Sequence, residues 1–239
     1  CVYNPKAASA EKFAIQHRIE NYTDSLEELT MLTDAVYIAS LHETHYEYAK
    51  YMLNNKKHVL CEKPAVLKKA QAEELYSLAK ENNVVFMEAV KTAYCPGFHA
   101  MMAAAKSGKI GRIIDVEAAF SRLTPVNTRE YMAQDYNGSF LEFGSYVCMP
   151  VFELLGCDYD DVRFHSMRAV NGVDAYTKAV FSFGGKSAEV KTGLGVKTEG
   201  QLLISGTNGY ILAKSPWWLT KEFEIRYEDP NKKEVYKYA

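Results

Sequence analysis

The first thing this 239-residue sequence lacks is glycine near its start. None of its 14 glycines precedes Gly97, so the first part of the chain holds no glycine-rich turn that could cradle a phosphate group. Cysteine pairs are missing as well. The five cysteines are odd in number and include no Cys-x-x-Cys pair, which favours reduced thiols over a disulfide framework and predicts no metal site.

An excess of charge of one sign and a long apolar run are also absent. The 28 basic and 30 acidic residues leave a formal net charge of −2, which argues against a nucleic-acid partner. No apolar run approaches the roughly 20 residues of a membrane helix, and no signal peptide opens the chain. With 48% hydrophobic residues, we expect a soluble, cytoplasmic, globular protein without a membrane partner.

Strand and helix patterns alternate through the first 94 residues. Compact apolar runs at 35–39, 59–61 and 84–87 have the composition of strands buried on both faces. Helical periodicity separates them at 45–53 and 68–82. This alternation predicts a doubly wound parallel sheet of the α/β class, in which the carboxyl ends of the strands line a ligand crevice.

The pattern changes after a helix predicted at 96–106. Alternating residues predict strands, and one helix at 140–155 interrupts them. Gly184-Gly185 and Asn208-Gly209 are hairpin turn signals. The second part is therefore expected to be an α+β domain with a large open, mostly antiparallel sheet. Its strands are predicted at 113–121, 162–170, 176–183, 187–192, 201–205 and 222–227.

Lys63 is the first candidate for chemistry. It follows the predicted strand 59–61 in the tripeptide Glu62-Lys63-Pro64, and Pro64 keeps the backbone out of a helix at this point. A side chain at the carboxyl end of a parallel strand points towards whatever the sheet binds. Taken alone, the tripeptide also fits an ordinary turn before a helix with a solvated lysine.

A series of motifs along the chain resembles the Gfo/Idh/MocA family, the nicotinamide-dependent sugar and cyclitol oxidoreductases. Each motif is weak alone, but their order is specific and spans nearly the whole chain. The resemblance implies a partial dinucleotide-binding Rossmann domain over 1–94 and an α+β substrate and oligomerisation domain over 95–239. The matching segments are Ala35–Ser40 with His45, His58–Pro64, Met87-Glu88-Ala89, Ser107–Gly111, Gly138–Tyr146 and Gly206–Gly209.

The resemblance also implies which residues act. Lys63 would lie beside the substrate hydroxyl and the nicotinamide, where an ammonium stabilises a developing alkoxide while a hydride leaves the carbon. The family places an acidic residue four positions before a His or Tyr on the helix of the second domain, and here the pair is Glu142 and Tyr146. A partly buried structural aromatic is the alternative for Tyr146. Lys91 stands near the place of a family arginine and is the further candidate for substrate contact.

The cofactor implied by the resemblance is NAD or NADP. Its expected contacts follow the strands of the first domain. Near the usual acidic ribose position the chain has Asn4 and Lys6, which leans towards NADP. His42 replaces a common family Asn, and a histidine in a surface loop is the alternative there. The full expected set is Asn4, Lys6, Ser40, Leu41, His42, His45, Glu62, Lys63 and Glu88.

The missing Gly-x-Gly-x-x-Gly loop is the main departure from the family. Because the ribose position follows that loop by about 20 residues, we expect the chain to be a fragment that lacks the first strand and the loop. Without that strand, the strands at Cys1 and Ala35 would each carry an unpaired edge.

We expect an oxidoreductase acting on a small sugar, cyclitol or related vicinal diol. The alternative is a non-catalytic ligand-binding or regulatory protein on the same fold. Family habit also predicts a homo-oligomer, a dimer or tetramer, formed through the C-terminal sheet.

Overall fold

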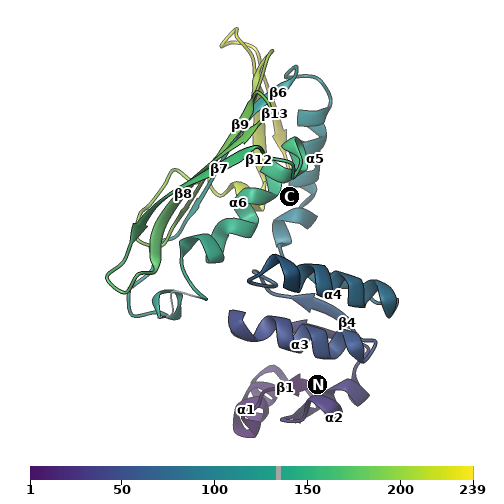
Figure 1. Cartoon of the computed structure of the whole chain (residues 1–239). Coiled ribbons are helices and arrows are strands. Elements are labelled where there is room, and N and C mark those ends of the chain that lie inside the picture. Colours follow the sequence, from purple (N-terminus) through teal and green to yellow (C-terminus); the bar gives the residue numbers. More distant parts are fainter. Residues whose placement is uncertain (133–135, 239) are drawn as a thin grey trace. The chain divides into compact units, whose positions relative to one another are not determined.

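A computed structural model describes residues 1–132 and 136–238 of the chain. The chain divides into two compact units, Cys1–Ala89 and Val90–Ala239. They run from purple to blue and from teal to yellow in Figure 1. The predicted boundary after Tyr94 falls at the end of a short 3-10 helix, η1 (Lys91–Tyr94), which belongs to the second unit.

The first unit contains the predicted alternation of strands and helices. Its main sheet consists of three parallel strands in the order β3-β4-β5, joined by helices α3 and α4. Apolar side chains on the helices pack against the strands, and Leu53, Cys61 and Leu75 are fully buried between them. The elements are β3 (Ala35–Ile38), α3 (His42–Asn54), β4 (His58–Cys61), α4 (Lys69–Glu81) and β5 (Phe86–Glu88).

A separate two-stranded parallel sheet opens the chain. It pairs β1 (Val2–Tyr3) with β2 (Tyr22–Thr23), and helices α1 (Ala7–His17) and α2 (Leu26–Leu32) accompany it. The sequence did not predict β2, because two residues are too few to show a period. Among the described strands, β3 pairs with β4 alone, and Tyr37 on this outer strand is 58% exposed.

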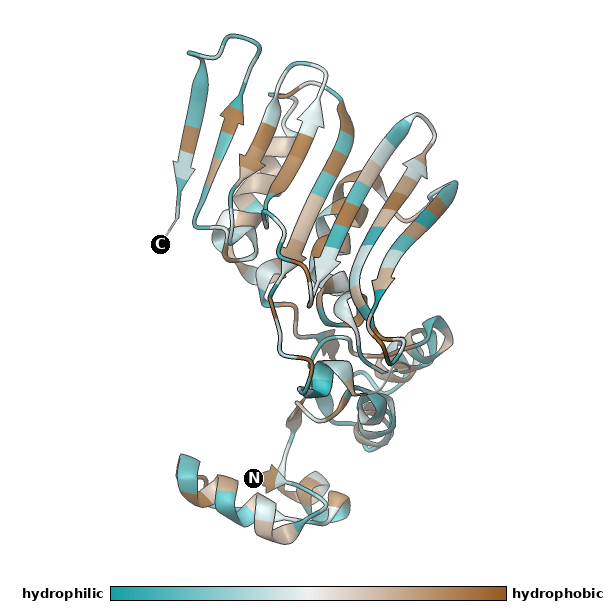
Figure 2. Cartoon of the chain, turned by 90° about the vertical axis from the view of Figure 1, so that its left-hand side faces the viewer, coloured by the Kyte–Doolittle hydropathy of each residue, from teal (hydrophilic) through white to brown (hydrophobic). Residues whose placement is uncertain are grey.

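The second unit is built on one open sheet of eight strands, in the order β13-β12-β11-β10-β6-β9-β8-β7. Seven pairs of neighbours are involved, and of these only β6 and β9 run parallel, so the predicted, mostly antiparallel sheet is confirmed. Figure 1 shows α5 and α6 on one face of this sheet. In Figure 2 the opposite face lies in front, with hydrophilic and hydrophobic residues alternating along its strands.

The remaining elements follow the chain in this order: α5 (Pro96–Lys106), β6 (Ile113–Ser121), η2 (Arg129–Tyr131), α6 (Ser139–Leu155), β7 (Asp161–Arg168), β8 (Asp174–Phe183), β9 (Lys186–Gly193), β10 (Leu202–Gly206), β11 (Tyr210–Ala213), η3 (Trp217–Leu219), β12 (Glu222–Arg226) and β13 (Lys233–Lys237). Both predicted hairpin turns are confirmed, between β8 and β9 and between β10 and β11. Strands β11 and β13 were not predicted. Among the described residues, no helix is both long and apolar enough to cross a membrane.

Alternate residues of the sheet form the core of the second unit. Ala179 and Phe181 of β8, Val190 of β9 and Ile204 of β10 are at most 4% exposed, and they pack with α5 and α6 in one hydrophobic cluster. Because successive side chains of a strand point to opposite faces, this period fixes which face receives the helices. It thereby fixes the position of α6, which carries two of the predicted site residues.

A cluster of polar side chains ties the edge strand β13 to the turn after α5. Lys109 Nζ lies 2.5 Å from Glu234 Oε2 and 2.7 Å from the Tyr236 hydroxyl. The Tyr227 hydroxyl donates to the other carboxylate oxygen of Glu234 at 2.7 Å. The hydrogen bond from Lys109, helped by those from Tyr236 and Tyr227, lowers the pKa of Glu234 to about 2.

This cluster predicts a pH-dependent contribution to the stability of the second unit. Because the folded-state pKa of Glu234 is depressed, its contribution is present above the pKa of the unfolded state and disappears as the pH falls towards about 2. We expect Glu234→Gln to lower the denaturation midpoint at neutral pH by a small amount, since the pair is partly exposed. The difference from the parent chain should shrink between about pH 5 and pH 2.

Tryptophan fluorescence measures this, because both tryptophans, Trp217 and Trp218, lie in the second unit. Glu228→Gln is the matched control, since Glu228 is exposed and carries the same charge close to the same edge. Equal midpoints for Glu234→Gln and the parent chain at neutral pH would contradict the stabilising role of the cluster.

Candidate active site

The ends of three parallel strands come together at one edge of the first sheet. Ile38 of β3 is paired with Cys61 of β4, and Cys61 with Glu88 of β5. The residues that follow these positions therefore lie at the same edge, where an open α/β sheet binds its ligands. Ser40, Glu62, Lys63 and Glu88 belong to this edge, as the order of strands and helices predicted.

Backbone and carboxylate hydrogen bonds hold the turn that carries Lys63. The Glu62 amide donates to the Ile38 carbonyl at 2.8 Å. The Glu62 carboxylate accepts from the Tyr37 hydroxyl and, at 3.2 Å, from the Lys63 amide. One residue beyond Pro64, the Ala65 amide donates to Glu88 Oε1 at 3.0 Å. Both acidic residues expected near the cofactor thus also anchor the backbone on either side of Lys63.

Two of the expected cofactor residues are buried histidines at the start of α3. His42 is 5% exposed and His45 is 0% exposed, and their rings meet edge to face with centroids 5.7 Å apart. Leu41, directly before the helix, is 51% exposed. The sequence could not distinguish a buried from an exposed histidine here. The structure places both rings beneath the surface, and His45 contacts the carbonyl oxygens of Ser40 and Pro64.

Asn4 and Lys6, expected near the ribose, follow β1. The Asn4 side-chain oxygen accepts from the Lys6 amide at 2.9 Å, and the Asn4 amide donates to the Thr23 carbonyl at 3.2 Å. These contacts shape the turn before α1. Lys6 is exposed at the N-cap of that helix, so its ammonium is accessible to an anionic group.

In the second unit, α6 carries both predicted acid–aromatic residues. Glu142 and Tyr146 are 3% and 9% exposed, and a spacing of four residues puts them on the same face of the helix. The burial excludes a merely solvated glutamate. Tyr146 also packs into the hydrophobic core of this unit, so part of its ring is structural, as the alternative interpretation held.

An aromatic stack that the sequence analysis missed adjoins Tyr146. The Phe120 ring lies parallel to Trp218 with centroids 3.7 Å apart and parallel to Phe143 at 4.4 Å. Its edge meets the Tyr146 ring at 5.1 Å. Phe120 lies in the predicted strand 113–121, but nothing in the sequence showed that these four residues from β6, α6 and η3 would meet.

The N-terminus of α6 is fixed by a carboxylate from the sheet. Asp174 Oδ2, on β8, accepts hydrogen bonds from the Ser139 hydroxyl at 2.6 Å, the Phe140 amide at 3.0 Å and the Thr177 hydroxyl at 2.8 Å. The preceding Gly138 has φ of 130° and lies so close to Asp174 that a Cβ atom would clash with it. A negative charge at this end also suits the helix dipole. The position of Glu142 and Tyr146 therefore depends on β8.

Lys91, the remaining substrate candidate, is exposed in η1. Its neighbour Thr92 is fully buried and donates to the Trp218 carbonyl at 2.7 Å. This bond joins the start of the second unit to the aromatic stack. The structure thus gives Lys91 an accessible side chain on an anchored backbone.

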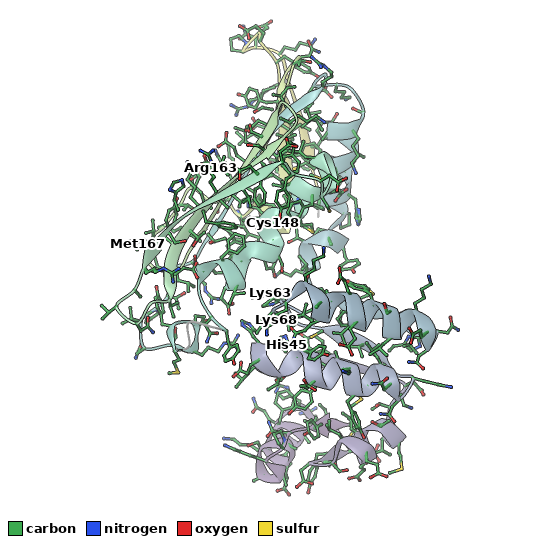
Figure 3. The ribbon with its side chains drawn as sticks, viewed as in Figure 1. His45, Lys63, Lys68, Cys148, Arg163 and Met167 are labelled. Atoms are coloured by element: carbon green, nitrogen blue, oxygen red, sulfur yellow. The ribbon has the colours of Figure 1, made fainter. Side chains whose placement is uncertain are left out.

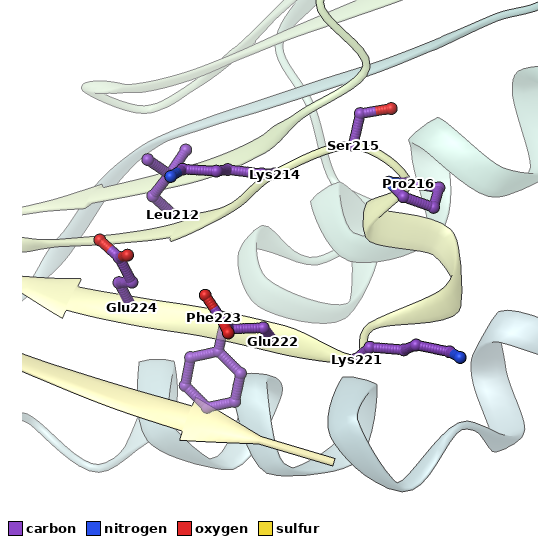
Figure 4. A pocket seen from close by; sticks show the side chains of 8 residues that line it. All are labelled: Leu212, Lys214, Ser215, Pro216, Lys221, Glu222, Phe223 and Glu224. Atoms are coloured by element: carbon purple, nitrogen blue, oxygen red, sulfur yellow. The ribbon is translucent and has the colours of Figure 1, made fainter. Parts of the chain in front are cut away.

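A cavity of about 220 Å³ lies in the second unit where β11 leads into β12 (Figure 4). Leu212, Pro216 and Phe223 form its apolar wall, and Lys214 and Glu222 contribute charged groups. None of the predicted site residues lines it. Among the described residues, no group of three or more His, Cys, Asp or Glu side chains is arranged to hold a metal ion.

Comparison with protein families assigns both parts of the chain. Residues 1–90 match the family described as "Oxidoreductase family, NAD-binding Rossmann fold". Residues 98–212 match the GFO/IDH/MocA C-terminal domain. The order of the two domains is the one that the sequence motifs predicted.

Relatives of established activity are similar over most of the chain. Scyllo-inositol 2-dehydrogenase (NADP(+)) IolU of Bacillus subtilis is 32% identical over 240 residues, which cover 95% of this chain and 71% of the relative. A trans-1,2-dihydrobenzene-1,2-diol dehydrogenase of Xenopus laevis is 29% identical over 216 residues, with coverage of 87% and 64%. The chain thus spans about two thirds of the length of these enzymes.

Solved structures share the fold. Levoglucosan dehydrogenase in complex with NADH and levoglucosan superposes with a TM-score of 0.85 at 19% identity, over 99% of this chain and 70% of that one. KijD10, a 3-ketoreductase from Actinomadura kijaniata in complex with NADP, gives 0.83 at 21% identity, over 98% and 74%. The order of motifs, the two folds and these similarities agree, and the chain belongs to the Gfo/Idh/MocA family of oxidoreductases.

Proposed function

We propose that this protein is an NAD(P)-dependent oxidoreductase that transfers a hydride between a nicotinamide cofactor and a CH–OH group of a sugar, cyclitol or related vicinal diol. The observation that carries the proposal is Lys63 on an anchored turn at the carboxyl edge of the parallel sheet, in a member of this family. The scyllo-inositol and dihydrobenzene-diol dehydrogenases among its relatives act on cyclic compounds with neighbouring hydroxyls.

The residues present fit the nicotinamide side of the cofactor. Three parallel strands end in register, and Ser40, Leu41 and Lys63 follow them at that edge. The 239 residues contain no Gly-x-Gly-x-x-Gly loop, so the fit does not extend to the pyrophosphate. When bound, the nicotinamide accepts or donates the hydride; the residues of the chain position the substrate and handle its proton.

Lys63 supplies the charge for the reacting oxygen. In the oxidation direction, the substrate hydroxyl loses its proton as the hydride leaves the same carbon, so negative charge develops on the oxygen. An ammonium held beside that oxygen stabilises the charge in the transition state. The anchored backbone on both sides of Lys63 favours this role, because the effect depends on a fixed position.

Tyr146 is the group that we propose to exchange the proton, with Glu142 as the acidic residue that orients it or the substrate. The packing of Tyr146 against Phe120 holds its ring in place. Trp218, which is partly exposed and stacks on Phe120, is proposed to contact the apolar C–H face of a cyclic substrate. Lys91 completes the proposed substrate contacts.

The choice of nucleotide leans towards NADP. NAD-dependent enzymes have a carboxylate at the ribose position, where we expect this chain to have the exposed Lys6. The ammonium of Lys6 suits the 2′-phosphate of NADP. The 32% identical IolU uses NADP(+). The remaining expected cofactor residues, Asn4, His42, His45, Glu62 and Glu88, are proposed to shape or contact this part of the binding region.

We also propose that the protein works in the cytoplasm as a homo-oligomer that pairs through the open face of the eight-stranded sheet. Two features support this face. Tyr176, Val180 and Leu203 alternate on it with charged residues, as Figure 2 shows for the strands in general. Ion pairs join Glu189 to Lys178 at 2.6 Å and to Lys191 at 3.7 Å, which gives the face a defined pattern of charge.

The test of the proposed function is turnover. The chain is incubated with NAD⁺ or NADP⁺ and a panel of scyllo-inositol, myo-inositol, levoglucosan and a trans-dihydrodiol, and the absorbance of the reduced nicotinamide is followed. Formation of reduced cofactor with at least one of these substrates is expected. Binding of a polyol without any formation of reduced cofactor would favour the ligand-binding or regulatory role on the same fold.

Replacement of Lys63 should separate chemistry from binding. We expect Lys63→Met to lower kcat by about 10²- to 10⁴-fold, the range for loss of a group that handles proton or charge, while cofactor affinity changes little. The matched control is Lys68→Met, since Lys68 is exposed on the neighbouring segment (Figure 3). A Lys63→Met enzyme with unchanged turnover would remove this lysine from the chemistry.

Removal of the Tyr146 hydroxyl should give a similar but independent loss. Tyr146→Phe keeps the packing against Phe120 and is expected to lower kcat by about 10²-fold or more. Tyr159→Phe removes a hydroxyl from a tyrosine that is 44% exposed and serves as the control. If Lys63 and Tyr146 act in the same step, the double variant will lose much less than the product of the two single effects. Fully multiplicative effects would contradict a shared step.

A further inference from the structure

A fully buried histidine connects the two turns at the edge of the parallel sheet. His45 lies in the first turn of α3 and is 0% exposed. Its Nδ1 atom is 2.9 Å from the Pro64 carbonyl oxygen, and its Nε2 atom is 3.2 Å from the Ser40 carbonyl oxygen. Figure 3 labels both His45 and Lys63 on the first unit. The ring thus spans from the segment after β3 to the segment after β4.

The chemistry of the ring decides which contact is the hydrogen bond. A carbonyl oxygen only accepts, and a neutral imidazole has a single N–H. The neutral ring therefore donates to one of the two oxygens, and the shorter contact places its hydrogen on Nδ1, facing Pro64.

We propose that His45 is a positioning residue whose Nδ1–H binds the Pro64 carbonyl and so fixes the backbone from which Lys63 projects. The turn already has anchors in the Glu62 amide and the Ala65 amide. The Glu62 amide bonds to Ile38 of β3, and the Ala65 amide bonds to Glu88 of β5. His45 lies on helix α3 and binds the carbonyl group of the residue that follows Lys63.

The consequence for catalysis rests on the proposed function of Lys63. Without the hydrogen bond from His45 the turn loses one of its anchors, and the ammonium of Lys63 samples more positions. Charge stabilisation depends on a fixed distance to the reacting oxygen, so kcat falls. The binding of cofactor, which uses other residues as well, changes less.

Two amide side chains separate the two contacts of the ring. The amide nitrogen of Asn can occupy the place of Nδ1, and that of Gln the place of Nε2. His45→Asn therefore keeps a donor for Pro64, His45→Gln moves the donor towards Ser40, and His45→Ala has none. All three remove the ring, so the loss of its packing is common to them and cancels in the comparison.

Hydrogen exchange at single amides reports the hydrogen bond from His45 without any need for activity. We expect the Ala65 amide to exchange about three- to tenfold faster in His45→Gln and His45→Ala than in His45→Asn, the range for loss of one hydrogen bond. The Val59 amide, which donates to Val85 within the same sheet at 2.8 Å, is the internal control and should exchange equally in His45→Asn and His45→Gln. In the parent chain, a long-range ¹H–¹⁵N spectrum of His45 should show Nδ1 as the protonated nitrogen.

Three results would overturn the proposal. The first is protonation of His45 at Nε2 in that spectrum, and the second is an equal exchange rate of the Ala65 amide in His45→Asn and His45→Gln. The third is a difference in exchange rate between these two variants that is the same at Ala65 and at Val59. With a turnover assay, His45→Asn should retain the parent kcat more closely than His45→Gln, with similar cofactor KM in both. If the parent chain shows no turnover at all, the proposed function fails, while the exchange data still decide whether His45 holds the turn.

Discussion

The in-register ends of β3, β4 and β5 are the constraint on which the candidate site of the first unit depends. Because Ile38, Cys61 and Glu88 are paired across the three strands, the turns that follow them meet at one edge. The sheet itself then supplies partners for the turn of Lys63, as the bond from the Glu62 amide to the Ile38 carbonyl shows. A reactive lysine needs such a rigid base, since a flexible ammonium would be solvated and far less effective.

The second unit also holds its proposed site residues in fixed positions, but it does so through a helix packed on a sheet. A single helix, α6, carries Glu142 and Tyr146, and an eight-stranded sheet fixes the helix by packing and by the Asp174 carboxylate at its N-terminus. The sheet also brings Phe120 against Tyr146. In both units, then, the residues proposed to act in catalysis are positioned by neighbouring residues that also stabilise the fold.

Much of this could be predicted from the sequence, because periodicity and local motifs carry it. The buried runs at 35–39 and 59–61 gave the parallel strands, and their ends located Lys63. The features that could not be predicted depend on contacts between residues that are far apart in the sequence. The two-residue strand β2 shows no period, and no local pattern shows that Trp218 stacks on Phe120. Burial of His45 was also beyond prediction, because a histidine in a helix carries no mark of the partners its ring will find.

The central claim is that a carbon-bound hydrogen of a polyol is transferred to a nicotinamide, and isotope transfer tests it most directly. The chain would be incubated with NADP⁺, and in parallel with NAD⁺, in the presence of scyllo-inositol deuterated at its ring carbons, and the reduced cofactor analysed by mass spectrometry. Our account predicts one deuterium on the nicotinamide ring of each reduced cofactor, and with Lys63→Met about 10²- to 10⁴-fold less deuterated cofactor at the same reaction time. Bound cofactor that gains no deuterium from this cyclitol, from levoglucosan or from a dihydrodiol would contradict it.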